Sequence, residues 1–150
     1  MNKTFSRMAA LWMSILLGSC VSFKISPPPL PENFADPLVL CKKVTQKGEL
    51  LFPEEIQEEF LSGSGSIYCY VRLHSVSRVI SLKWKWYGPG GCLARETDDV
   101  IVNEDEAFLE AVTAYDKLET RIEDGDEGRW TVLVLVNGVL AGRGTFLLKR

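Results

Sequence analysis

The sequence predicts a mainly β protein, an antiparallel sandwich of about seven short strands with one short helical segment. Apolar and polar residues alternate in IYCYVRL, residues 67–73, and in SLKWKWY, residues 81–87. The C-terminal stretch RWTVLVLVNGVLAGRGTFLLK, residues 129–149, holds two apolar runs around an Asn-Gly pair. Alternation of period two is typical of half-buried antiparallel strands, and Asn-Gly between apolar runs predicts a hairpin.

Each expected strand follows from its own segment, in chain order. We expect strands at 39–44, 66–74, 79–87 and 99–102, a strand at about 108–117, and a final hairpin that turns at Asn137-Gly138. A turn in GPGG, residues 88–91, separates two of them. The side chains that alternation assigns to the core are Ile67, Cys69, Val71, Leu73, Leu82, Trp84, Trp86, Trp130, Val132, Val134, Val136, Phe146 and Leu148.

Two segments carry helical signals. In residues 52–63, Pro53 and several acids come first, and Ile56 and Phe60 are four residues apart, so we expect one or two helical turns over 53–61. In residues 103–118, Asn103 and Glu106 form a capping box before a helical apolar stripe, yet the same residues also alternate. We favour a strand here, because the sandwich needs an edge partner, and keep a helix as the alternative. Short strands with regular turns are typical of immunoglobulin- or fibronectin-like sandwiches.

The N-terminus has the order of a secretory signal. Lys3 and Arg7 precede residues 8–17, which are apolar except for Ser14 and too short to span a bilayer, which takes about 20 residues. The sequence LGSC, Leu17 to Cys20, then resembles the lipobox of bacterial lipoproteins. This resemblance implies cleavage before Cys20 and acylation of that cysteine, which anchors the mature chain to a membrane.

The domain organisation follows from this start. We expect a signal peptide at 1–19, the lipidated cysteine and a proline-rich linker at 20–37, and the sandwich domain at 38–150. Val21 stands where an aspartate would imply retention in the inner membrane, so the lipobox resemblance implies an outer-membrane anchor facing the periplasm.

Export to an oxidising compartment favours one disulfide among the cysteines that remain in the domain. Cys41 and Cys69 lie on strands that we expect to pair antiparallel, so we favour that disulfide, with Cys92 as the spare thiol. The other pairings stay open, because connectivity cannot be deduced from sequence alone.

Charge and motifs argue against several function classes. The net charge is −3, and loss of Lys3 and Arg7 leaves 15 basic and 20 acidic residues, a charge of −5. Nucleic-acid binding therefore has no electrostatic support. His74 is the sole histidine, no G-x-S-x-G occurs, and the acidic stretch IEDGDEG at 122–128 lacks the EF-hand pattern. We expect no enzyme, no cofactor and no metal site.

The domain also resembles bacterial envelope domains of the domain-of-unknown-function 2914 type. The resemblance rests on Cys41 and Val44, on IYCYVRL, WKWY and GRWTV, and on a terminal F-x-L after the Asn-Gly turn. These are core and turn residues, so the resemblance implies a fold and supplies no catalytic residue.

The remaining expectation concerns a working surface. If Trp130, Val132, Val134 and Val136 face the core, Leu133 and Leu135 point outward, where a solvated sheet face is normally polar. We expect a non-catalytic module that binds an envelope protein or a second copy, with a carrier of a small apolar or lipid ligand as the alternative. The proline linker or the 53–61 segment could instead cover this face. The expected partner-binding residues are Lys83, Lys85, Tyr87, Leu133 and Leu135.

Overall fold

The computed structural model describes residues 30–77, 79–102, 108–120 and 126–150 and contains nine strands in these ranges. The strands are β1 (Val39–Lys47), β2 (Leu50–Ile56), β3 (Glu59–Leu61), β4 (Gly65–Ser77), β5 (Val79–Tyr87), β6 (Leu93–Val102), β7 (Phe108–Thr120), β8 (Gly128–Val136) and β9 (Val139–Lys149). The protein is therefore mainly β, as the sequence predicts, and the strand over 108–117 is confirmed.

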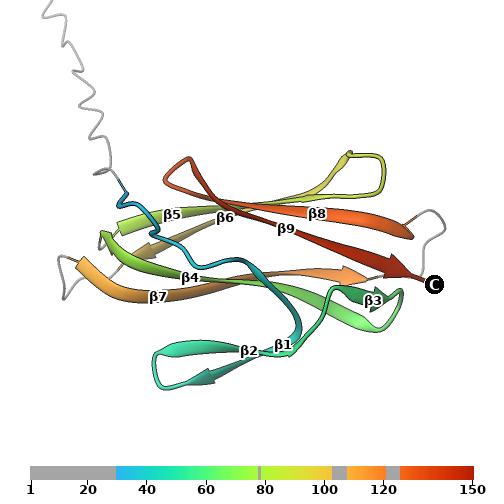
Figure 1. Cartoon of the computed structure of the whole chain (residues 1–150), viewed down its shortest axis with the longest axis horizontal. Coiled ribbons are helices and arrows are strands. Elements are labelled where there is room, and N and C mark those ends of the chain that lie inside the picture. The colour runs from blue at the N-terminus through green and yellow to red at the C-terminus, as the bar shows by residue number, and fades with distance from the viewer. Residues whose placement is uncertain (1–29, 78, 103–107, 121–125) are drawn as a thin grey trace, which may run out of the picture.

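The strands form two sheets that face each other (Figure 1). One sheet has the order β2-β1-β4-β7, and the other has the order β3-β9-β8-β5-β6. All neighbours are antiparallel except β3 and β9, which are parallel. The arrangement is consistent with a β-sandwich.

The core lies between the sheets and is filled by large side chains. Trp84, Trp86 and Trp130 are 1%, 0% and 6% exposed, which confirms that all three point inward. Phe146 packs between the sheets with ring centroids 6.2 Å from Trp86 and 6.0 Å from Trp130. The alternation in β4, β5, β8 and β9 is thus the consequence of one buried and one outward face on each strand.

The C-terminal hairpin turns where the sequence predicts. Asn137 and Gly138 have φ values of 50° and 80°, the pair of positive angles that a type I′ turn requires. Because this turn twists in the same sense as the strands, it fixes the register of β8 against β9. A register shift between Val134 and Leu135 then bends the hairpin near its tip.

The helical expectation for residues 53–61 is wrong, and this error also explains the higher strand count. The segment forms the end of β2 and all of β3. Pro53 lies opposite Val44 on an edge strand, a position that tolerates the missing N–H. Phe60 is 1% exposed and meets Phe146 edge-to-face at 5.5 Å, so it is held by a core contact that local helical spacing does not reveal.

Chain segments ahead of residue 38 already touch the sandwich. Ala35 forms an isolated bridge with Leu73 of β4, and the Phe34 carbonyl accepts a hydrogen bond from the His74 N–H at 2.7 Å. Leu30, Phe34 and Ala35 pack against the core. The packed unit therefore begins before the boundary that the sequence suggests.

Candidate interaction surface

The outward face of β5 and β8 brings the expected partner-binding residues together. Pairing of these strands places Lys83 opposite Leu135, Lys85 opposite Leu133, and Tyr87 opposite Thr131. The residues between them along each strand are buried in the core. We call the group Lys83, Lys85, Tyr87, Leu133 and Leu135 the β5–β8 face.

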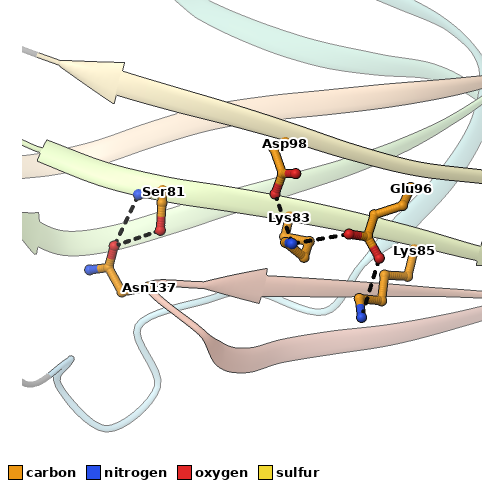
Figure 2. Close-up of polar contacts among 6 residues, drawn as sticks. All are labelled: Ser81, Lys83, Lys85, Glu96, Asp98 and Asn137. Carbon is orange, nitrogen blue, oxygen red and sulfur yellow. Dashed lines mark hydrogen bonds and ion pairs between the residues drawn. The ribbon is translucent and has the colours of Figure 1, made fainter.

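The two lysines of this face are held by acids on the next strand, β6 (Figure 2). The Lys83 ammonium lies 3.0 Å from Glu96 and 3.2 Å from Asp98, and the Lys85 ammonium lies 3.3 Å from Glu96. Hydrogen bonding to Glu96 raises the pKa of Lys83, and hydrogen bonds from Lys83 and Lys85 lower the pKa of Glu96. The lysine stems are therefore fixed beside the leucines, with their charges drawn toward β6.

The sequence does not predict Glu96 and Asp98 as neighbours of this face, because it predicts a strand in this region only at 99–102. Residues 93–98 alternate little in polarity, and charged residues follow one another along them, so the strand has no clear apolar face there. Pairing with β5 is what makes the segment extended.

The leucines are half-buried, and a group of exposed valines extends the surface beyond them. Val79, Val100 and Val102 are 47%, 59% and 56% exposed. Val79 lies opposite Val102 and Ser81 lies opposite Val100, so these valines point to the same side as the β5–β8 face. We call these three residues the valine patch. Alternation in DVIV, residues 99–102, is the signal that could have found two of them.

The turn at Asn137 ties this end of the sheet together. The Ser81 N–H donates to the Asn137 side-chain oxygen at 2.9 Å (Figure 2). The Asn137 N–H donates to the Ser81 carbonyl, also at 2.9 Å. These bonds fix β5 against the β8–β9 turn. Val79 and Val100, the outward valines nearest to Ser81, thus lie on a rigid support.

No segment that the structure describes lies across the β5–β8 face. The 53–61 segment contributes β2 to the other sheet and β3 to the far edge beyond β9. Residues 30–38 run along β4 and reach Gly142, which points inward. Pro27, Pro28 and Pro29, the other cover that the sequence suggests for this face, lie outside the described residues.

Cys41 and Cys69 do not form the expected disulfide in the structure. Cys20 lies outside the described residues, and the structure holds Cys41, Cys69 and Cys92 as free thiols. β1 and β4 do pair antiparallel, but Cys69 lies opposite Leu40 and Cys41 lies opposite Tyr68. Neighbouring positions on paired strands point to opposite faces, and side chains that point apart cannot form a disulfide without backbone movement.

The environments of the thiols also differ. Cys41 and Cys69 are both fully buried, and burial raises the pKa of each thiol. Cys92 is exposed, just after the turn at 88–91.

Groups that could support chemistry are sparse in the described chain. His74 is half-buried, and its Nε2 lies 2.8 Å from Asp36 Oδ1, a contact that ties the N-terminal segment to β4. Within the described ranges, no three His, Cys, Asp or Glu side chains gather as a metal site would require. The same ranges contain no helix long and apolar enough to cross a membrane.

Comparison with known proteins adds little to this geometry. Neither a protein-family model nor a curated protein matches the chain. Among solved structures, the alkylpurine DNA glycosylase AlkC from Pseudomonas fluorescens, bound to DNA containing an abasic site analog, is similar with a TM-score of 0.45 and 17% identity. The match covers 62% of this chain and 28% of that chain. A likeness at this level carries no argument about fold or activity.

Proposed function

We propose that the chain is a bacterial envelope lipoprotein, anchored through Cys20, whose immunoglobulin-like sandwich is a non-catalytic module that binds another envelope protein. The β5–β8 face and the valine patch form the binding surface. The outer-membrane, periplasm-facing location rests on the lipobox resemblance at Leu17 to Cys20 and on Val21.

The observation that carries the proposal is the composition of the outward sheet face. Leu133 and Leu135 stand in the middle of an exposed sheet face, where polar residues are the rule. Paired lysines and acids border them on one side, and the exposed valines extend the apolar area. An apolar centre with a charged rim is the usual composition of protein interfaces.

Binding to a protein is favoured over carriage of a small apolar ligand by the filled core. Trp84, Trp86 and Phe146 occupy the space between the sheets. A hollow of about 1150 Å³ in the described chain is open to solvent and is lined by Arg95, Asp99 and Asp116 together with apolar residues. A lipid carrier needs an enclosed apolar pocket instead.

The surface is tested by Leu133→Asp combined with Leu135→Asp in the full chain. We expect the variant to remain folded, because both side chains point outward, and to lose its crosslinked partner in envelope membranes. The matched control is Ile56→Asp combined with Leu61→Asp, which replaces two exposed apolar residues elsewhere, 66% and 56% exposed. Unfolding of the Leu133/Leu135 variant, or an unchanged crosslink, would refute the proposed surface.

The anchor is tested separately by Cys20→Ser. We expect the variant to leave the membrane fraction or to remain unprocessed, because acylation requires the cysteine sulfur. If the variant still matures and sediments with membranes, the lipobox interpretation fails.

A further inference from the structure

A second surface lies at the open edge of the sandwich and meets the valine patch at Val102. A groove of about 1150 Å³ runs between edge strands β6 and β7. The tip of the β1–β2 hairpin, residues 49–51, forms its third side. The Leu51 N–H donates to Thr113 Oγ1 at 2.9 Å, which holds this tip against the outer side of β7.

The floor of the groove is the backbone edge of β7. Seven consecutive residues, 111–117, line it. Successive residues of a strand point to opposite faces, so a groove that touches all of them follows the edge of the strand. In the described chain β7 hydrogen-bonds to β4 on one side only, which leaves the N–H and C=O groups of its other edge toward the groove.

Charged residues lie near both ends of β7, at Glu110 and at Asp116, Lys117 and Glu119, but its middle lacks the protection that the other three sheet edges have. β3 has three residues, β2 contains Pro53 and the positive φ of Glu55, and β6 carries four charged residues. Short strands, proline, irregular backbone and charge are the devices that prevent an edge from pairing with another chain. Residues 111–115 of β7 have the sequence AVTAY, which contains none of these devices.

The walls of the groove have an unbalanced charge. Arg95 is paired with Asp116 at 3.4 Å, and Lys117 is paired with Glu119 at 2.9 Å. Among the residues that the structure describes, neither Glu49 on one wall nor Asp99 on the other forms an ion pair with a cation. Both are exposed. The charges that a bound segment would contact at Glu49 and Asp99 are therefore negative.

We propose that this groove receives an extended, basic segment of another protein, which adds as a strand to the free edge of β7. In such strand addition, main-chain hydrogen bonds to β7 provide the part of the affinity that does not depend on the sequence of the bound segment. One row of side chains of the added strand faces Ile101, Val112 and Ala114, and a lysine or arginine meets Glu49 or Asp99. The groove shares Val102 with the valine patch but no residue with the β5–β8 face. Variants at Leu133 and Leu135 and variants at Glu49 and Asp99 therefore test the two proposals separately.

The test is selection of random eight-residue peptides displayed on phage against the full chain, purified in detergent. We expect enrichment of sequences that alternate apolar residues and contain lysine or arginine. Hydrogen exchange of the complex with a selected peptide should show added protection within residues 111–117, because the added strand occupies the free edge.

Variants then locate the binding. Glu49→Lys combined with Asp99→Lys should weaken the selected peptides by about fivefold or more, since two attractive charge contacts become repulsive. Glu32→Lys combined with Glu58→Lys makes the same charge change at exposed sites outside the groove and should have no such effect. Ala111→Lys should abolish binding by placing a charged side chain at the edge; if it does not fold, the Glu49/Asp99 variant decides.

Several outcomes would overturn the proposal. They are failure to enrich any sequence, enrichment of acidic sequences, or equal binding to the Glu49/Asp99 variant and its control. Self-association of the full chain through residues 111–117 would assign the groove to a second copy instead. Displacement of the selected peptides by a small apolar ligand alone would assign it to carriage.

Discussion

Removal of the Asp116 carboxylate should destabilise the sandwich through one hydrogen bond between its sheets. Asp116 lies on the inner face of β7, is 8% exposed, and accepts a hydrogen bond from the Trp86 indole N–H of the opposite sheet at 2.8 Å. Asp116→Ala removes a hydrogen bond to a charged group and leaves a buried N–H without its partner. Hydrogen bonds to charged groups are worth about 1.5–3 kcal/mol, and an orphaned buried donor costs about 1–3 kcal/mol. We therefore expect a loss of about 2–3 kcal/mol.

The assay is urea unfolding of the chain carrying Cys20→Ser, followed by tryptophan fluorescence. Asp116→Asn keeps an acceptor for the indole and should lose less than Asp116→Ala. A double-mutant cycle with Trp86→Phe isolates the shared hydrogen bond and should give a coupling energy of about 1.5–3 kcal/mol. A coupling energy near zero would contradict this expectation, because it would show that the carboxylate does not hold the indole.

Three further predictions follow from single contacts. Gly142→Ala should lower the free energy of unfolding by about 1–3 kcal/mol in the same assay, because an added Cβ would lie 2.8 Å from the Leu38 side chain; an unchanged midpoint would show that Leu38 moves freely. In an NMR titration the Glu96 carboxyl should titrate below an ordinary glutamate, and Lys83→Met should raise its midpoint. Because the folded-state pKa of Glu96 is lowered, its ion pairs contribute above the ordinary pKa and are lost as pH falls through the lowered value. An aromatic disulfide reagent should react quickly with Cys92 alone in the folded Cys20→Ser chain, and with the two buried cysteines only after unfolding; a single reactive thiol in the unfolded chain would restore the expected disulfide.

The strands that sequence predicts well are those with one buried and one outward face. In β5 and β8 each core residue alternates with an outward residue, so the order of residue types predicts which side chains are buried. The neighbours Lys83 and Leu135 could be expected on one face for the same reason, once β5 and β8 were taken as adjacent.

The features that sequence missed depend on partners distant along the chain. Residues 53–61 have helical spacing, but pairing of β2 with β1 and of β3 with β9 decides their structure. The opposed directions of Cys41 and Cys69 follow from a one-residue register that no local signal fixes. The groove at β7 exists only because β6 and the β1–β2 hairpin meet that edge in space.

Site-specific photocrosslinking tests the proposed binding surface most directly. A photoreactive amino acid replaces Leu135 in the full chain, in a bacterial host that processes lipoproteins, and the control carries it at Arg72, an exposed position on the outer side of the other sheet. We expect a discrete adduct with one envelope protein from position 135 and none from position 72. Absence of an adduct at 135, or the same adduct from both positions, would contradict it.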